Sequence, residues 1–323
     1  MSTWSSWIGL GSAADKAAKL ERVASHKEEV HARAVEALRA RLQETEEGRL
    51  CGQQLAQGGE FGPDGSASAL LSDAYLRRWL VARDWAVDVT YKLLVGHGGW
   101  RVHIAPRGYV EEERVRRELD DKKIFMQGVD YEGRALTIIQ VRKHFKRDLK
   151  ETKLFCCYIL DNMVNLCDRT RNPRGRLVSM FDMTGCALAN LDASTMSALL
   201  GMLGVHYVER LSAMYLYNPP GVFWALWNAS KALLPEVTRN KIKVIDPKDL
   251  SELRACVPPD VLPKEYGGDA ELRPIDAACR HFRLPPFHAD ADAALEVSDA
   301  PPPPKAVAAG AGVAAAAAVV VDA

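Results

Sequence analysis

Two charged residues flank an unusually apolar segment of this chain. Glu209 precedes and Lys241 follows the stretch VFWALWNASKALL, which runs from Val222 to Leu234. A lysine ammonium is a serviceable partner for phosphate, and a carboxylate accepts hydrogen bonds from sugar hydroxyls or pairs with a neighbouring base. Charge beside an apolar segment suits a ligand that is itself both polar and apolar, such as a phospholipid. Taken alone, each of the two residues would be interpreted as a plain surface charge.

The apolar segment does not have the pattern of a surface helix. A surface helix carries one apolar stripe roughly 100° wide, whereas apolar side chains here cover most of the circumference and only Asn228, Ser230 and Lys231 interrupt them. Such a helix is either buried in a core or lies between two apolar phases, as a lid over a lipid cavity would. Both interpretations remain open at this point.

The elements around these residues predict an α/β fold. Apolar runs at 135–141, 176–182, 211–217 and 241–245 are typical of strands, and helical patterns at 152–168 and 191–206 lie between them. This alternation predicts a largely parallel sheet with helical crossovers. An earlier helix carries Leu76, Trp79 and Leu80 on one face, and Arg83 extends the same inward stripe.

Composition changes along the chain predict six regions. A long helix over Ala13 to Glu47 lies within an N-terminal helical extension, and Gly, Gln and Ser after Cys51 suggest a flexible linker. A helical lobe and then the strand–helix region follow, and the end of the chain is low in complexity. The predicted regions are 1–50 (extension), 51–68 (linker), 69–121 (helical lobe), 122–270 (ligand-binding lobe), 271–300 (C-terminal extension) and 301–323 (disordered Pro/Ala-rich tail).

Composition also narrows the function classes. The 42 basic and 42 acidic residues cancel, so no nucleic-acid partner is expected from overall charge. The seven cysteines are odd in number and form no C-x-x-C pair, which argues against a disulfide framework or zinc site and for a reducing, cytoplasmic location. No metal ligands or catalytic motif stand out, so we expect no enzyme activity. The basic run Arg142 to Arg147 could meet anionic headgroups or form a solvated sheet edge.

Five sequence blocks occur in the order of one known family. They are LRRWLVARDWAVDV ending in Trp100-Arg101, GVDYEGRAL at Gly128 to Leu136, Asp182 to Gly185 (D-x-x-G), YVERL at Tyr207 to Leu211 with Asn218-Pro219-Pro220 and Lys241-Ile242, and LPKEYGG at Leu262 to Gly268. From about Leu71 to Gly268, the chain therefore resembles the CRAL-TRIO (Sec-fourteen-like) lipid-binding family and, within it, the phosphatidylinositol transfer proteins.

This resemblance implies a CRAL-TRIO fold, with a helical N-terminal lobe and a mostly parallel β-sheet lobe that holds a lipid pocket gated by a helix. It implies a gate and pocket made by Val222, Phe223, Leu226, Trp227 and Leu233. It implies a phosphoinositide headgroup site at Arg83, Glu209, Thr238 and Lys241. A second headgroup position, used in members that carry choline lipids, has Ser179 here, but its companion position is Leu177, which weakens the case for a choline lipid.

The expected function is non-enzymatic binding of a phospholipid, phosphatidylinositol above all, and its transfer or presentation between membranes. The protein would be cytoplasmic and would meet membranes transiently, with the bound lipid as its ligand and no cofactor. One alternative is a lipid-sensing adaptor for a lipid kinase or trafficking partner, with the N-terminal helix as the docking element for a protein. Another is a carrier of a different hydrophobic ligand, such as a retinoid, tocopherol or sterol-like molecule.

Overall fold

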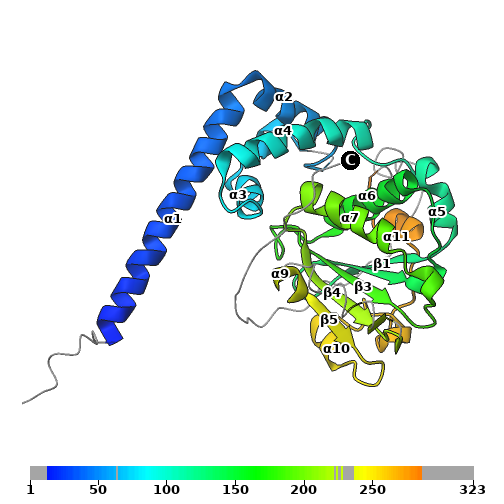
Figure 1. The fold of residues 1–323 in the computed structure, drawn as a ribbon. Helices are drawn as coiled ribbons and strands as arrows, with labels where there is room; N and C mark the ends of the chain where they lie inside the picture. Colours follow the sequence, from blue (N-terminus) through cyan, green and yellow to red (C-terminus); the bar gives the residue numbers. More distant parts are fainter. Residues whose placement is uncertain (1–12, 63–64, 222, 225–226, 228–235, 286–323) are drawn as a thin grey trace, which may run out of the picture.

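A group of N-terminal helices stands beside a lobe built on a five-stranded sheet (Figure 1). The computed structural model describes residues 13–62, 65–221, 223, 224, 227 and 236–285. The predicted tail at 301–323 lies outside these residues.

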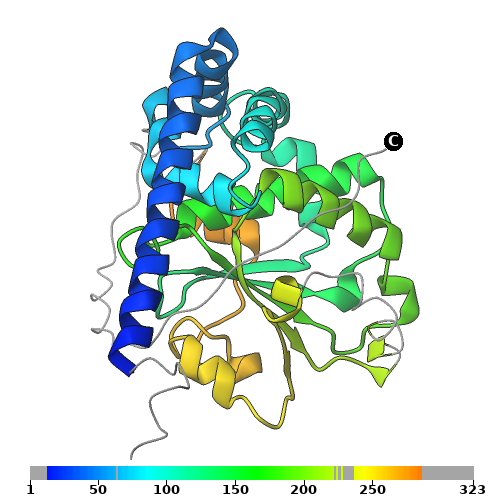
Figure 2. The ribbon, with the colours of Figure 1, turned by 60° about the vertical axis from the view of Figure 1, so that its left-hand side comes forward.

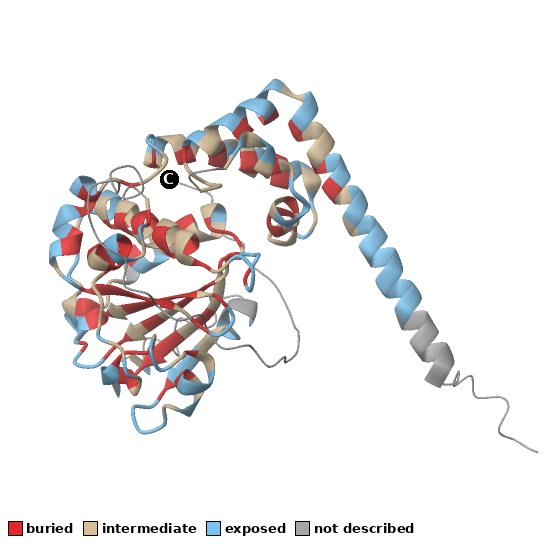
Figure 3. Cartoon of the chain, turned by 180° about the vertical axis from the view of Figure 1, so that it is seen from behind, coloured by how far each residue is buried: buried red, intermediate tan, exposed pale blue. Residues whose placement is uncertain are grey.

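The N-terminal helices share one apolar core. Leu38 of α1, Leu55 of α2, Trp79 of α3 and Leu94 of α4 are all fully buried in it. The N-terminal half of α1 leaves this core and projects into solvent, with residues 21–30 exposed (Figures 1 and 3). The elements of this part are α1 (Ala13–Glu44), α2 (Glu46–Gln57), η1 (Ala67–Leu71), α3 (Asp73–Val81) and α4 (Val87–Ile104).

The structure replaces part of the predicted linker with a helix. Residues 51–57 belong to α2, where Cys51 is buried and its thiol donates to the Leu94 carbonyl at 3.2 Å. The glycines that suggested flexibility instead permit close packing. A Cβ at Gly58, where α2 ends, would lie 2.5 Å from Arg101 Cγ and 3.1 Å from the Arg101 carbonyl carbon in α4, so the missing Cβ lets the two helices approach. The linker prediction was wrong here because composition does not reveal tertiary contacts.

The second lobe is built on a sheet in the order β1-β2-β3-β4-β5. The β1 strand pairs antiparallel with β2, and the other neighbouring strands are parallel. Its elements are η2 (Glu112–Val115), α5 (Arg116–Asp120), β1 (Ile124–Val129), β2 (Ala135–Gln140), η3 (Val141–Lys143), α6 (Leu149–Leu166), β3 (Leu177–Asp182), η4 (Leu188–Asn190), α7 (Ala193–His206), β4 (Leu211–Tyr217), α9 (Glu236–Arg239), β5 (Ile242–Ile245), α10 (Ser251–Cys256), η6 (Lys264–Tyr266) and α11 (Ile275–His281).

Helices cover both faces of the sheet. The helices α6, α7 and α11 lie on one face, and α10 lies on the other (Figures 1 and 2). Under α10, alternate residues of the central strands are buried, among them Val178, Met180 and Tyr215. The prediction of an α/β fold with a mostly parallel sheet is confirmed.

Candidate functional site

The helix α7 carries more apolar surface than its packing uses. Met202 is buried against the lobe core, whereas Met196, Leu200 and Val205 are exposed large apolar residues. Within the described residues, Leu188–His206 is the one stretch that is long and apolar enough to cross a membrane by length and composition, and 19% of its hydrophobic window is buried. A helix that already packs on a sheet has no need of apolar residues on its outer side, so this surface suits a nonaqueous neighbour.

The sheet face opposite α10 is only half covered. Along β3, Val178, Met180 and Asp182 point to the α10 side and are buried, whereas Ser179 and Phe181 on the other face are only partly buried. The same face continues in partly buried residues of β4 and β5, Met214 and Ile242. An apolar face left partly open loses the stabilisation that full burial provides, about 25 cal/mol per Å². It can regain this stabilisation by burying an apolar ligand.

The described residues of the predicted gate lie at this open face. Phe223, like Phe181, Met214 and Ile242, is partly buried and packs against the buried cluster that contains Leu216. Its ring stacks near that of Trp227 at 5.8 Å and meets Trp224 edge-on at 5.6 Å. Trp224 itself is exposed. The other predicted gate residues, Val222, Leu226 and Leu233, lie outside the described residues.

The structure brings two predicted headgroup residues together. Burial lowers the pKa of Lys241, just before β5; the carboxylate of Glu209, just before β4, opposes the decrease by attraction, and Arg176 adds to it by repulsion. Lys241 has no ion pair within 4 Å in the described chain. Glu209 has a left-handed backbone (φ 55°), a conformation costly for a non-glycine residue and often found at functional sites. A half-buried lysine without an ion pair is suited to an anionic ligand.

Arg83 is placed differently from the prediction. The helix α3 ends at Val81, and Asp84 and Trp85 adopt left-handed φ angles (48° and 64°) that turn the chain away. Arg83 is therefore in the turn after the helix, not on its inward stripe. Its guanidinium is half-buried and donates to the Gly204 carbonyl of α7 at 2.8 Å, and burial lowers its pKa.

Two further predicted positions are located by the backbone. Thr238 belongs to α9, between the gate segment and Lys241, although its side chain lies outside the description. Ser179 is in the middle of β3, where its partners are Thr137 of β2 and Met214 of β4. Ser179 therefore occupies the half-covered apolar face and not the strand ends where Glu209 and Lys241 lie.

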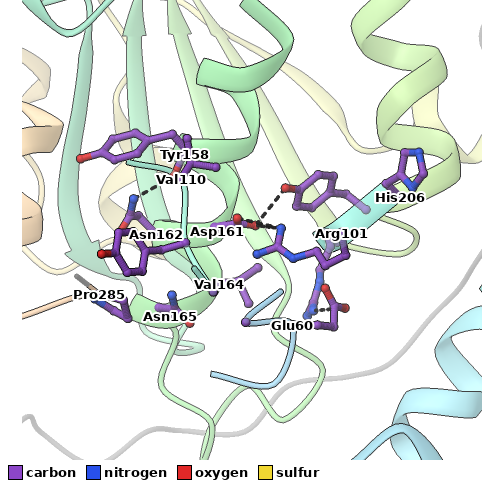
Figure 4. Close-up of a pocket in the computed structure, with 15 residues that line it drawn as sticks. Glu60, Arg101, Val110, Tyr158, Asp161, Asn162, Val164, Asn165, His206 and Pro285 are labelled. Atoms are coloured by element: carbon purple, nitrogen blue, oxygen red, sulfur yellow. Dashed lines mark hydrogen bonds and ion pairs between the residues drawn. The ribbon is translucent and has the colours of Figure 1, made fainter. Parts of the chain in front are cut away.

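Sequence reasoning missed a polar network between the two lobes (Figure 4). Arg101 of α4 pairs with Asp161 of α6 (Nη1 to Oδ2, 2.8 Å) and donates to the Gly58 carbonyl. Asp161 also accepts from the Tyr207 hydroxyl at 2.9 Å. The surrounding cavity is about 20 Å³, which is room for about one water. The network therefore joins the lobes rather than holding an organic ligand.

The same junction contains a pair of histidines. The Nδ1 atoms of His97 and His206 are 3.0 Å apart, and His206 stacks on Trp100 with ring centroids 3.8 Å apart. At that distance one ring donates an N–H to the other, and burial lowers the pKa of His97 while the nearby carboxylate of Glu60 opposes the decrease. Burial, followed by repulsion from His97, lowers the pKa of His206 to about 3, with Arg101 lowering it further and Glu60 opposing the shift.

These histidines predict a loss of stability in mild acid. The unfolded chain takes up a proton near the usual histidine pKa of 6.5, but folded His206 does not until about pH 3. As the pH is lowered from about 6.5 toward 3, the free energy of unfolding should therefore decrease, by up to about 1.4 kcal/mol per pH unit for one group. Urea unfolding at pH 7.5, 6.5 and 5.5 measures the slope. His206→Gln should have a shallower slope; equal slopes would show that the histidine pair does not titrate in this way.

Comparison with known proteins identifies the second lobe. Residues 119–268 match the family model of the CRAL/TRIO domain. The chain contains a CRAL-TRIO domain. The resemblance in the sequence blocks is thereby confirmed, and the domain boundaries of the match include the sheet, the gate segment and the Glu209–Lys241 pair.

Relatives and a solved structure agree with this identification. The chain is 24% identical over 212 residues to "Phosphatidylinositol transfer protein CSR1" of Eremothecium gossypii, covering 62% of this chain and 48% of the relative. It is 23% identical over 206 residues to "CRAL-TRIO domain-containing protein C3H8.02" of Schizosaccharomyces pombe, covering 61% and 45%. The match thus spans about half the length of these two relatives. The crystal structure of Sfh5 has the same fold (TM-score 0.54, 16% identity, 75% of this chain and 90% of that one).

Proposed function

We propose that this CRAL-TRIO protein binds a phospholipid, phosphatidylinositol in the first place, and carries or presents it between membranes without catalysing a reaction. The half-covered apolar sheet face beneath Phe223 is the observation that carries the proposal. Acyl chains buried there would gain about 0.8 kcal/mol per CH₂ group, which offsets their removal from a bilayer. The names of relatives such as CSR1 support the choice of phosphatidylinositol.

The headgroup would lie toward the strand ends. Lys241 would pair with the phosphate, and Glu209 would accept hydrogen bonds from inositol hydroxyls or hold Lys241 in place. Thr238, next to Lys241 along the chain, would donate a hydrogen bond. Arg83 would act through α7, whose Gly204 carbonyl it binds, unless the bound lipid draws its guanidinium away.

A bulky residue at Ser179 should block the acyl site. Ser179 is partly buried on the open apolar face, so Ser179→Trp fills space that acyl chains would use. We expect vesicle-to-vesicle transfer of phosphatidylinositol to fall at least about tenfold, at a stability cost of about 1–3 kcal/mol. Ser179→Ala is the matched control and should transfer normally. Wild-type transfer rates in a folded Ser179→Trp protein would refute this location for the lipid.

A further part of the proposal is that exposed apolar residues near a basic loop contact the donor or acceptor membrane. Phe145 and Leu188 are about 60% exposed. Phe145 follows η3 and Leu188 begins η4, and the Asn190 amide of η4 donates to the carbonyls of Arg142 and His144 beside Phe145. The loop around Phe145 is basic, with sequence RKHFKRDLK at 142–150. Exposed apolar side chains surrounded by basic residues suit an anionic bilayer surface. Each nearby Lys or Arg contributes about 1 kcal/mol to the binding free energy.

Removing the two apolar tips should weaken membrane binding. The double variant Phe145→Ala/Leu188→Ala is expected to lower partitioning onto anionic vesicles at least about tenfold, because burying one such side chain contributes about 1.5–3 kcal/mol. Val23→Ala/Val30→Ala on the projecting part of α1 removes comparably exposed apolar groups and serves as the control in the same sedimentation assay. An equal loss in both double variants would show that this surface has no special role.

A further inference from the structure

A hollow rich in arginine opens at the amino end of the parallel strands. Its volume is about 250 Å³. Arg134 comes just before β2, and the other arginines belong to the loop that joins α6 to β3. Its lining residues are Glu132, Arg134, Arg171, Asn172, Pro173, Arg174 and Arg176. We call this feature the arginine hollow.

The four arginines of the hollow are not equally neutralised. Arg134 pairs with Asp130 (Nε to Oδ2, 2.6 Å) and Glu132 (Nη1 to Oε2, 2.9 Å). Arg171 pairs with Asp168 at 2.6 Å. For Arg174 and Arg176, no side-chain hydrogen bond or ion pair is found in the described part of the chain. Two guanidinium groups that line the hollow, one exposed and one half-buried, therefore have no protein partner among the described residues.

The loop that carries these two arginines is fixed by packing. Gly175 between them has a left-handed φ of 58°, and a Cβ there would lie 2.3 Å from Arg169 Nη1 and 2.5 Å from Arg210 Nη1. Arg210 Nη1 donates to the carbonyls of Arg174 and Gly175 at 3.0 and 3.2 Å. The Asn172 side-chain oxygen also accepts a hydrogen bond from the Arg176 backbone N–H at 3.0 Å. The backbone that carries the two arginines is thus set before any ligand arrives, which lowers the cost of binding.

Positive charge behind the loop adds to that of the lining. Burial lowers the pKa of Arg169, and burial with the nearby Arg78 lowers the pKa of Arg210 to about 9. Arg78 and Arg210 share the carboxylate of Glu60, at 3.1 and 4.0 Å. One carboxylate cannot neutralise both guanidiniums. The potential at the hollow therefore favours an anion over a neutral or cationic ligand.

The arginine hollow is electrostatically connected to the proposed headgroup site. Arg176 lowers the pKa of Lys241 by repulsion, so the two cations are close enough to interact electrostatically. Within the described residues, none of Lys241, Arg176 and Arg174 has an ion pair. A single site for one phosphodiester needs only one of them. The surplus points to a ligand with more than one phosphate.

We propose that the arginine hollow binds the phosphate groups of a phosphorylated inositol, either as the headgroup of a phosphoinositide or as a free inositol phosphate. The choice of inositol rests on the proposed function, whereas the preference for phosphate rests on the arginines themselves. Planar guanidinium forks match phosphate oxygens two at a time. The hollow has room for a phosphorylated ring and not for a diacyl lipid, so acyl chains would stay elsewhere.

The test is binding of a soluble probe to the full chain. Inositol 1,4,5-trisphosphate is titrated calorimetrically into wild-type protein and into Arg174→Ala/Arg176→Ala. The double variant should bind at least about tenfold more weakly, the loss expected for a missing charge-assisted hydrogen bond. The control, Arg33→Ala/Arg107→Ala, removes two exposed arginines elsewhere, with side chains 78% and 67% exposed. It alters net charge equally and should bind as wild type.

A second arm distinguishes the two sources of phosphate. Co-sedimentation with phosphatidylcholine vesicles containing phosphatidylinositol 4,5-bisphosphate is compared for the same proteins. A loss in both arms supports recognition of the phosphates themselves, and a loss with vesicles alone supports the membrane headgroup. The proposal is overturned if wild type binds neither probe, or if the hollow variant and the control lose affinity equally.

The outcome is separable from that of the proposed function. Arg174→Ala/Arg176→Ala should still transfer unphosphorylated phosphatidylinositol at the wild-type rate. If wild type transfers that lipid but the Arg174→Ala/Arg176→Ala variant binds the trisphosphate as tightly as wild type, only the arginine hollow assignment fails. If wild type binds the trisphosphate through Arg174 and Arg176 but transfers no phosphatidylinositol, only the transfer function fails.

Discussion

Lys241→Ala is expected to reduce phosphatidylinositol transfer between vesicles about 10- to 100-fold. The Lys241 ammonium is half-buried, and in the described chain it has no ion pair within 4 Å, while Glu209 holds it electrostatically. A charge-assisted hydrogen bond to the lipid phosphate would contribute about 1.5–3 kcal/mol. Glu209 is the one carboxylate that loses a nearby cation in this variant, so folding should be little affected. Transfer of fluorescent phosphatidylinositol measures the rate.

The next lysine along the same strand provides a matched control. Lys243 is more exposed and pairs with Glu252 of α10 on the other side of the sheet. Lys243→Ala should therefore change stability by less than about 1 kcal/mol and leave transfer intact. If both variants transfer normally, Lys241 is not a headgroup ligand and the strand-end site is wrong, whatever lipid the apolar face holds.

Arg101→Ala is expected to lower the free energy of unfolding by about 3–5 kcal/mol, the usual effect of leaving one partner of a buried ion pair alone. Arg101 and Asp161 are both largely buried at the junction of the two lobes, and burial raises the pKa of Asp161 while Arg101 opposes the increase. The variant also leaves the Gly58 carbonyl without its donor. Urea unfolding at neutral pH measures the loss from the shift in midpoint.

Two comparisons sharpen this result. Arg107→Ala removes an exposed arginine that pairs with Glu111 and should cost under about 1 kcal/mol. The double variant Arg101→Met/Asp161→Leu should recover much of the stability, because an apolar pair of similar size avoids the stranded charge. A loss for Arg101→Ala no larger than that for Arg107→Ala would mean that the junction network does not hold the lobes together.

The central strands were predictable because local signals agree there. The β4 strand has the predicted bounds Leu211–Tyr217, since an apolar run ends at the Asn218-Pro219-Pro220 turn. The β1 strand was missed. Gly128 within it has a φ of 132°, and the register shifts between Met126 and Gly128, so the alternation on which a strand prediction depends is broken.

Parts of the candidate site could not be predicted because distance along the chain hides their contacts. Glu209 and Lys241 were identified by type and by their positions beside an apolar segment. The junction network joins Arg101 to Asp161, His97 to His206 and Arg78 to the Val208 carbonyl, and no local pattern links such residues. Arg83 was assigned to a helix face because nothing in its side-chain type indicates that Asp84 and Trp85 end the helix.

The central claim is that this CRAL-TRIO domain holds a phospholipid between its open sheet face and the gate, with its headgroup at Lys241. Native mass spectrometry of the full chain, purified without added lipid and followed by release and fragmentation of any bound molecule, tests it directly. We expect one bound phosphatidylinositol-type lipid per chain, and its occupancy should fall in Ser179→Trp. A bound retinoid, tocopherol or sterol, or a folded chain that carries no lipid and takes none up from vesicles, would contradict the account.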